Sequence, residues 1–132
     1  MSKHNSSKNI LIIDDDPIAR MLAKRNLEIA GFKGSIHTAD NGLVGYEMLR
    51  ESSDSYVVLL DFHMPELDGI GLLQLLEEKG LKTSIFMLSS SILSTNQNNC
   101  LSFENVQEFM VKPIDQLKTK TIMEFTLQNI FH

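Results

Sequence analysis

Four short apolar runs of the sequence end in residues that can take part in phosphate chemistry. Asp14 and Asp15 follow the first run, Asp61 the second, Ser89 the third and Lys112 the fourth. Carboxylates that lie a few ångströms apart repel one another, so a cluster of them needs a proton or a cation. Oxygen ligands favour a hard cation such as Mg²⁺, which typically combines one or two carboxylates with water and phosphate oxygens.

The lysine and the hydroxyl complete the set of groups that a phosphoryl-transfer site uses. Lys112 supplies a compact positive charge for phosphate oxygens, and Ser89 supplies a hydroxyl donor. A carboxylate such as that of Asp61 can act as a nucleophile and form an aspartyl phosphate. Catalysis at such a site consists of positioning and charge neutralisation. The residue types therefore predict phosphoryl transfer at Asp61.

These side chains can meet only if the runs before them lie side by side. The apolar runs are Ile10–Ile13, Ser35–Thr38, Tyr56–Leu60, Ile85–Leu88 and Val106–Val111. Short, continuously apolar runs are typical of strands that are covered on both faces in a parallel sheet. The carboxyl ends of parallel strands share one edge of the sheet, where ligands bind.

Helical patterns separate the runs. We predict helices from Pro17 to about Ala30, Asn41 to about Arg50, Asp68 to about Lys79, Ile92 to Leu101, and Ile114 to Phe131. Asp16, Asn41 and Asp68 are placed to begin the first three, since short polar side chains cap helix N-termini. Five alternations of strand and helix predict a doubly wound α/β fold with a five-stranded parallel sheet.

Composition limits the class of protein. The 132 residues suit one domain, for which we expect residues 8–132, with residues 1–7 as a flexible N-terminus. A net charge of −5 argues against binding nucleic acid or an anionic membrane. Cys100 is the single cysteine, so no intrachain disulfide is possible, and we expect it to be at least half-buried. No apolar run approaches the ~20 residues that span a bilayer, so we expect a cytoplasmic protein.

The last predicted helix has apolar residues on two sides. One stripe is expected to face the core, and it contains Leu117, Met123, Leu127, Ile130 and Phe131. Ile122 and Phe125 fall opposite this stripe and are either a patch that faces a partner or ordinary surface residues.

Four segments resemble one family of signalling domains. Ile-Leu-Ile-Ile-Asp-Asp-Asp-Pro (10–17) resembles the acidic turn after the first strand of response-regulator receivers. Residues 57–69, which include Asp-Phe-His-Met-Pro and Asp-Gly, are similar to the segment around the phosphorylated aspartate. Phe-Met-Leu-Ser-Ser (86–90) and Phe-Met-Val-Lys-Pro-Ile (109–114) are similar to the ends of the fourth and fifth strands. The order and spacing match from about residue 8 to residue 131.

The resemblance implies a flavodoxin-like sheet of order 2-1-3-4-5 and a role for each site residue. Asp61 would accept a phosphoryl group from a phosphohistidine, and Lys112 would contact both Asp61 and that group. Mg²⁺ would be held by Asp15 directly, by Asp14 through water, by Asp61, and by the backbone carbonyl of His63. The resemblance also implies a cis peptide between Lys112 and Pro113.

The resemblance implies a switch as well. The Ser89 hydroxyl would move toward the phosphoryl group and Phe109 would turn inward after it, which would remodel the face of the fourth helix, fifth strand and fifth helix. The His63 side chain would lie at the mouth of the site with Ser91, since Mg²⁺ prefers oxygen to nitrogen.

Partners and competing functions follow from the same residues. The phosphoryl donor would be a sensor histidine kinase or a histidine phosphotransfer protein, and the target would be another protein. The chain itself would be a monomer or a weak dimer. We expect a stand-alone regulator with slow autodephosphorylation and no enzyme activity, although a receiver cut from a larger regulator or hybrid kinase fits too. An aspartate-nucleophile phosphatase fits poorly, because His63 stands where that chemistry needs a second aspartate.

Overall fold

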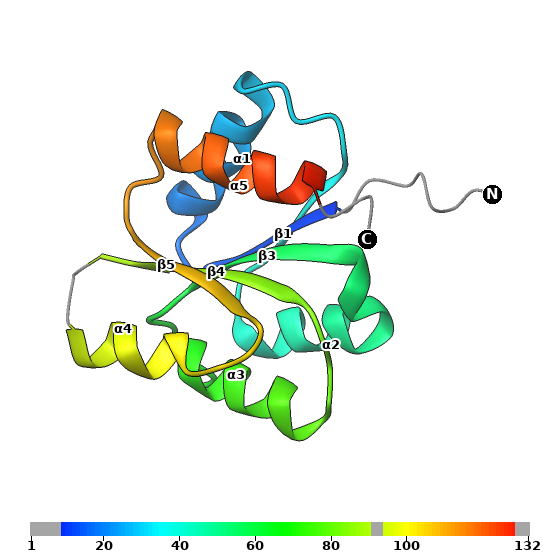
Figure 1. Cartoon of the computed structure of the whole chain (residues 1–132), viewed down its shortest axis with the longest axis vertical. Coiled ribbons are helices and arrows are strands. Elements are labelled where there is room, and N and C mark those ends of the chain that lie inside the picture. The colour runs from blue at the N-terminus through cyan, green and yellow to red at the C-terminus, as the bar shows by residue number, and fades with distance from the viewer. Residues whose placement is uncertain (1–8, 91–93, 129–132) are drawn as a thin grey trace.

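A five-stranded parallel sheet forms the centre of the protein. The computed structural model describes residues 9–90 and 94–128 (Figure 1). The strands are β1 (Asn9–Ile13), β2 (Ile36–Ala39), β3 (Tyr56–Asp61), β4 (Ser84–Ser89) and β5 (Val106–Val111). Their order is β2-β1-β3-β4-β5, so the predicted doubly wound, flavodoxin-like fold is confirmed. β2 and β5 are the edge strands.

Helices cover both faces of the sheet. They are α1 (Pro17–Ile29), α2 (Gly42–Ser52), α3 (Gly69–Glu78), α4 (Ser94–Leu101) and α5 (Gln116–Gln128), with a short 3₁₀ turn, η2 (Ser53–Ser55). α1 and α5 lie side by side on one face, and α2, α3 and α4 cover the other (Figure 1). Within the described residues no helix is long and apolar enough to cross a membrane.

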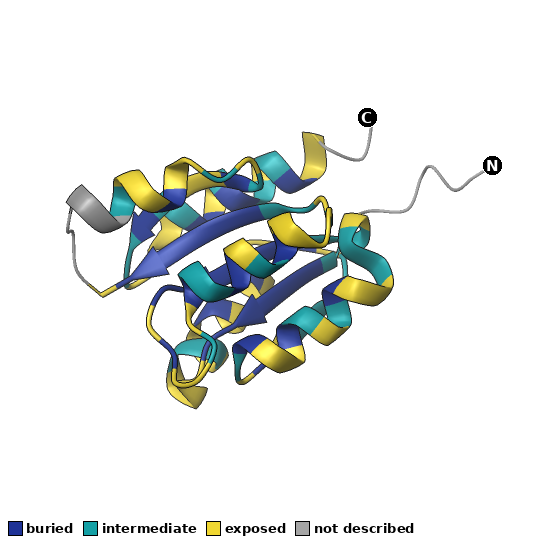
Figure 2. Cartoon of the chain, turned by 90° about the horizontal axis from the view of Figure 1, so that it is seen from below, coloured by how far each residue is buried: buried dark blue, intermediate teal, exposed yellow. Residues whose placement is uncertain are grey.

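Alternate residues of each strand enter two separate cores. Leu11, Val58 and Leu60 pack toward α2 and α3, while Ile12 and Leu59 pack toward α1 and α5. Beyond their first residues the central strands β1, β3 and β4 are buried, whereas the edge strands β2 and β5 include exposed residues and the outer sides of the helices are exposed (Figure 2). Burial on both faces explains why the runs of the three central strands are almost continuously apolar instead of alternating.

Three predicted helix caps are confirmed. The side chain of Asp16 accepts a hydrogen bond from the amide of Ile18, that of Asn41 from Val44, and that of Asp68 from Gly71. The caps fix where α1, α2 and α3 begin, and α1 and α3 each follow a loop that carries site residues.

The predicted faces of the last helix were wrong. Ile122 is fully buried and Phe125 packs edge-on against Phe86 at 5.3 Å between ring centroids, whereas Leu117 is 72% and Leu127 50% exposed. Of the predicted core stripe, Met123 alone packs against the core within the described residues. The predicted patch of Ile122 and Phe125 is therefore part of the core.

Threonines explain the reversal. Thr119 and Thr126 are buried on the same side of α5 as Ile122, and their hydroxyls donate to the carbonyls of Asp115 and Ile122, each at 2.8 Å. A hydroxyl that bonds within its own helix can be buried at little cost. A pattern that counted only apolar residues therefore chose the wrong side.

Some predictions lie outside the described residues. These are the flexible N-terminus at residues 1–7, the place of Ser91, the start of the fourth helix at residue 92, and the last helix beyond residue 128.

Candidate functional site

The predicted site residues meet at the carboxyl edge of the sheet. Asp14 directly follows β1, and its amide donates a hydrogen bond to the carbonyl oxygen of Ala39, the last residue of β2. Asp61 and Ser89 are the last residues of β3 and β4, and Lys112 follows β5. β1 and β3 are neighbours although α1, β2 and α2 separate them in the sequence, which creates the crevice where such sheets bind ligands.

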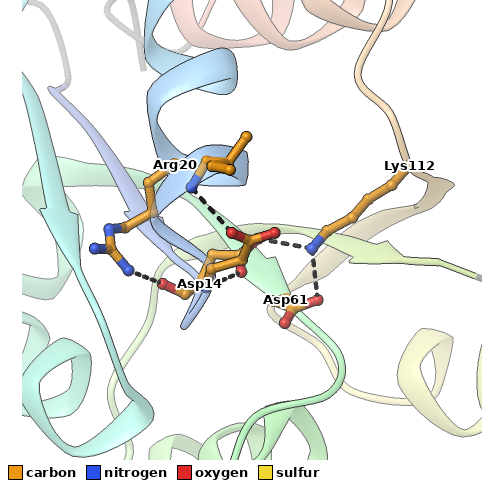
Figure 3. A network of polar contacts seen from close by, with 6 residues as sticks. Asp14, Arg20, Asp61 and Lys112 are labelled. Carbon is orange, nitrogen blue, oxygen red and sulfur yellow. Dashed lines mark hydrogen bonds and ion pairs between the residues drawn. The ribbon is translucent and has the colours of Figure 1, made fainter.

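Lys112 is the bridge between two carboxylates. Its Nζ lies 2.7 Å from Oδ2 of Asp14 and 3.0 Å from Oδ1 of Asp61 (Figure 3). Both carboxylates are buried, with Asp14 at 3% and Asp61 at 5% exposure. Buried charges of one sign require such a partner, because burial removes the water that would otherwise stabilise them.

The backbone around Asp14 is held firmly. Its Oδ1 accepts a hydrogen bond from the Asp16 amide at 2.9 Å, and its carbonyl accepts one from Nη1 of Arg20 at 2.7 Å. Arg20 lies on the other side of Asp14 from Lys112 (Figure 3). Both carboxylate oxygens of Asp14 therefore have protein partners.

Three carboxylates lie close enough to share a cation. Ligand oxygens of Asp14, Asp15 and Asp61 lie within 4.8 Å of one another, and Asp15 is exposed. With one ammonium from Lys112, the four side chains carry a formal charge of −2 when all are ionised. Carboxylate oxygens, an open side and excess negative charge together suit Mg²⁺, which keeps several of its own waters.

Burial and charge act in opposite directions on the two central groups. Burial is the main cause that raises the pKa of Asp61, and the charges of Asp14 and Asp15 raise it further against the lowering effect of Lys112. For Lys112, burial alone would lower the pKa, but the ion pairs with Asp14 and Asp61 outweigh burial and raise it. The lysine therefore stays charged, while the charged form of Asp61 is disfavoured.

The remaining predicted residues surround this centre. Ser89 is buried, and its carbonyl accepts a hydrogen bond from the Lys112 amide at 2.7 Å. Phe109 is half-buried, with its ring 6.3 Å from that of Phe62, the residue after Asp61. The peptide between Lys112 and Pro113 is cis, as the resemblance implied.

His63 lies at an open mouth beside the acidic cluster. Its ring is exposed and meets the ring of Phe62 edge-on at 4.8 Å. The open space here has a volume of about 300 Å³ and is lined by Asp15, His63, Met64, Pro65 and Asp68. His63 is absent from the group of side chains that lie close enough to share a metal among the described residues.

A second hollow adjoins the site on the side of α1. It has a volume of about 210 Å³ and lies between α1 and the connection from β5 to α5. Leu22, Ala23, Leu88 and Ile114 give it an apolar lining, and Asp14 and Lys112 form its end toward the site. The sequence did not reveal this hollow, because its walls come from distant segments.

Three polar side chains that brace the site were not predicted either. They are Arg20, Asn26 and Lys118, and each donates to a backbone carbonyl in or directly before one of the two loops that carry Asp14 and Lys112. Each looks like an ordinary polar residue of a helix surface in the sequence. Glu66 was also missed, and its φ of 65° marks a tight turn in the loop after Asp61.

Comparison with known proteins agrees with this geometry. The family model for the response regulator receiver domain matches residues 10–124. The chain therefore belongs to the receiver domains of two-component response regulators. The transcriptional regulatory protein SrrA of Staphylococcus aureus is 35% identical over 125 residues, which cover 91% of this chain and 49% of SrrA. The chain thus spans about half the length of the curated relatives that it matches.

Solved structures show the same fold. A response regulator receiver domain protein from Clostridium thermocellum has a TM-score of 0.79 at 24% identity, with 92% of this chain and 95% of that chain covered. The chemotaxis protein CheY4 of Vibrio cholerae has a TM-score of 0.73 at 20% identity, with 95% and 99% covered.

Proposed function

We propose that this receiver domain accepts a phosphoryl group on Asp61 from a phosphohistidine donor and changes its affinity for a protein partner in response. The observation that carries the proposal is the single ammonium of Lys112 between Asp14 and Asp61, at 2.7 and 3.0 Å. Lysine at this point can neutralise charge on a phosphoryl group attached to Asp61 without leaving Asp14.

The transfer is a displacement at phosphorus. One carboxylate oxygen of Asp61 attacks the phosphorus, the phosphorus–nitrogen bond of the donor breaks, and the imidazole leaves with the electron pair of that bond. The ammonium of Lys112 pairs with one oxygen of Asp61 and neutralises the negative charge that builds up on the phosphoryl oxygens. Ser89 ends β4 at the same edge of the sheet, and its hydroxyl donates to a phosphoryl oxygen after transfer.

The acidic cluster fits Mg²⁺. Asp15 is the most accessible carboxylate, so we assign it the direct contact, whereas both oxygens of Asp14 have protein partners, which fits a contact through water. The Asp61 carboxylate and the backbone carbonyl of His63 complete the proposed protein ligands. Bound there, Mg²⁺ supplies the positive charge that brings phosphoryl oxygens to the site.

The donor and the target use different surfaces in this proposal. A sensor histidine kinase or a histidine phosphotransfer protein has to reach Asp61 from solvent, and the apolar hollow beside Lys112 offers that donor a contact surface. The target binds the face of α4, β5 and α5, which Phe109 joins to the site through its packing on Phe62. We propose that the domain acts in the cytoplasm and binds no nucleic acid itself.

One observation favours a second proposal, in which this receiver domain is part of a longer regulator. Relatives that match along almost the whole chain are named transcriptional regulatory proteins, and the matched stretch is 49% of their length. The same phosphorylated state would then control an attached output segment in place of a separate partner.

Phosphorylation can be tested with acetyl phosphate and Mg²⁺, followed by intact mass. We expect one added phosphoryl group on the wild type, none with a chelator in place of Mg²⁺, and none on Asp61→Asn. Lys112→Met should fold but accept the group at least tenfold more slowly, because one charge-neutralising donor is lost. An undiminished adduct on Asp61→Asn would contradict the proposal.

The protein is proposed to be a phosphoacceptor and not a turnover enzyme. A phosphatase with an aspartate nucleophile needs a general acid near that nucleophile, and His63 occupies the position in question without a carboxylate. Steady hydrolysis of p-nitrophenyl phosphate that depends on Asp61 would favour the phosphatase instead. We expect slow loss of the phosphoryl group from Asp61 and no such turnover.

A further inference from the structure

Side chains from two helices bind the carbonyls on either side of Lys112. Nζ of Lys118, in the first turn of α5, lies 2.6 Å from the carbonyl oxygen of Val111 and 3.4 Å from that of Pro113. Nδ2 of Asn26, in α1, lies 2.9 Å from the carbonyl oxygen of Ile114. Three carbonyls within four residues are therefore held from outside their own segment.

The peptide group that leads into Lys112 is held at both of its ends. Its N–H donates to the carbonyl of Ser89 on β4 at 2.7 Å, and its C=O, which belongs to Val111, accepts from Lys118 at 2.6 Å. A trans peptide points its N–H and C=O in opposite directions, so these two bonds fix the plane of the group. β5 is an edge strand, which leaves the outward carbonyl of Val111 without a neighbouring strand.

We infer that Lys118 is a positioning residue for Lys112. By holding the Val111–Lys112 peptide, its ammonium fixes the direction in which the Lys112 side chain leaves the backbone toward Asp14 and Asp61. The inference rests on the proposed function, since Lys112 acts there on the transferred phosphoryl group. Lys118 itself contacts backbone carbonyls and is placed outside the reacting atoms.

The rate of phosphoryl transfer should be sensitive to a small displacement of the Lys112 ammonium. Displacing a catalytic group by about 1 Å can cost about 100-fold in rate. Asn26 still holds Ile114 when Lys118 is replaced, so the loop should shift only in part. We therefore expect Lys118→Met, which keeps the length of the side chain but cannot donate, to lower the rate of labelling by acetyl phosphate with Mg²⁺ about tenfold. Lys118→Arg should restore most of the rate.

A positioning role differs from a general structural role in two measurements. Mg²⁺ affinity, measured by calorimetry, should stay within about twofold in Lys118→Met, because the metal depends chiefly on Asp15. Hydrogen exchange of the Lys112 amide should become faster in Lys118→Met, while amides of β1 and β3 keep their rates. In a Lys112→Met background, replacing Lys118 should change the labelling rate no further.

Lys120→Met is the matched control. It removes the same charge from an exposed position two residues further along α5 and should leave labelling at the wild-type rate. If Lys118→Met and Lys120→Met lower the labelling rate equally, the change in net charge explains the loss of rate, and the inference is overturned. A wild-type rate in Lys118→Met, an equal fall in Mg²⁺ affinity, or unchanged exchange of the Lys112 amide would overturn it as well.

Failure of the proposed function looks different. If the wild type takes up no phosphoryl group from acetyl phosphate, the role of Asp61 as an acceptor fails. The exchange rate of the Lys112 amide still tests in that case whether Lys118 positions Lys112, because this measurement needs no phosphoryl transfer.

Discussion

Asp61 combines a cost for the stability of the fold with the proposed role of phosphoryl acceptor. The residue is 5% exposed, and its side chain lies close to two other carboxylates. The positive charge of Lys112 that balances it is shared with Asp14. Burial and the neighbouring charges raise its pKa, so ionised Asp61 makes the metal-free domain less stable at neutral pH. A neutral side chain of the same shape should therefore be tolerated better.

Asp61→Asn should stabilise the metal-free protein at pH 7. We expect a gain of about 1 kcal/mol, or about 4 °C in melting temperature. The native pKa of Asp61 lies above its unfolded value, so the penalty is complete above the native pKa and disappears as the pH falls toward the unfolded value of about 3.9. Melting curves in chelator at pH 7 and pH 4 measure both effects.

The exposed carboxylate of Glu108 provides the control for that measurement. Glu108→Gln removes the same charge and should leave the melting temperature within about 1 °C at both pH values. A lower melting temperature for Asp61→Asn at pH 7 in chelator would show that the ion pair with Lys112 outweighs burial.

Cys100 should be an unreactive thiol in the folded protein. It is fully buried, as predicted, and burial is the main cause that raises its pKa from 9.0 to about 11. The thiolate fraction at pH 8 is then about one in a thousand, and the thiol is also shielded. A chromogenic disulfide reagent should label the native protein at pH 8 far more slowly than the protein in urea.

The same pKa has a consequence for stability. The unfolded chain loses the thiol proton from about pH 9 and the folded chain only near pH 11, so the domain loses stability as the pH rises through this interval. Cys100→Ala should lack that loss. Rapid labelling of the native wild type at pH 8 would contradict both expectations.

At the scale of elements, the sequence was informative where local chemistry decides the outcome. Continuous apolar runs predicted the central strands, weaker runs predicted β2 and β5, and Asp16, Asn41 and Asp68 predicted three helix starts, because each signal acts within a few residues. The meeting of Asp14, Asp61 and Lys112 was also predictable, since parallel strands bring their carboxyl ends to one edge.

The missed features depend on contacts between distant segments. Asn26 donates to a carbonyl 88 residues away, and Lys118 reaches back to an edge strand that is defined only once the sheet has formed. The faces of α5 were assigned wrongly for a related reason, because Thr119 and Thr126 can be buried once their hydroxyls bond within the helix. Periodicity of apolar residues carries no information about such bonds.

Gly42 offers a test of packing between elements. It is the first residue of α2, and a Cβ added there would lie 2.5 Å from the carbonyl oxygen of Leu67, in the loop between β3 and α3. Alanine is normally about 1 kcal/mol better than glycine inside a helix. Here we expect Gly42→Ala to destabilise by about 1–3 kcal/mol, because backbone must move.

Urea denaturation measures that difference, with Leu43→Ala as its neighbour control. Leu43 is 51% exposed, so its truncation should change the free energy of unfolding by less than about 1 kcal/mol. Increased stability of Gly42→Ala would show that the loop before α3 yields easily at this contact.

At the scale of the whole molecule, the proposed binding of Mg²⁺ at the acidic site would couple folding to metal binding. The three carboxylates come from two segments that are distant in the sequence, the turn after β1 and the end of β3, so the unfolded chain cannot hold Mg²⁺ in the same way. A ligand that binds only the folded state stabilises it by about 2.7 kcal/mol at 100 times its dissociation constant. A cation bound there would offset the cost of clustering Asp14, Asp15 and Asp61.

Mg²⁺ should therefore reverse the order of stability between the wild type and Asp61→Asn. In chelator the variant is expected to melt higher, because it lacks a buried charge. As Mg²⁺ is added, the wild-type melting temperature should rise while that of Asp61→Asn rises less, since one proposed ligand is neutral. The two titration curves should cross.

Asp15→Asn separates metal binding from the burial of Asp61 in this experiment. Asp15 is exposed, so its replacement should change the melting temperature in chelator by no more than about 1–2 °C but should remove most of the response to Mg²⁺. Curves that rise in parallel for all three proteins would place Mg²⁺ elsewhere on the molecule. If a cation is held between these carboxylates, the curves of the wild type and Asp61→Asn should cross and the curve of Asp15→Asn should stay flat. Both results are required, because the cation stabilises the fold by balancing the buried charge of Asp61 and needs Asp15 in order to bind.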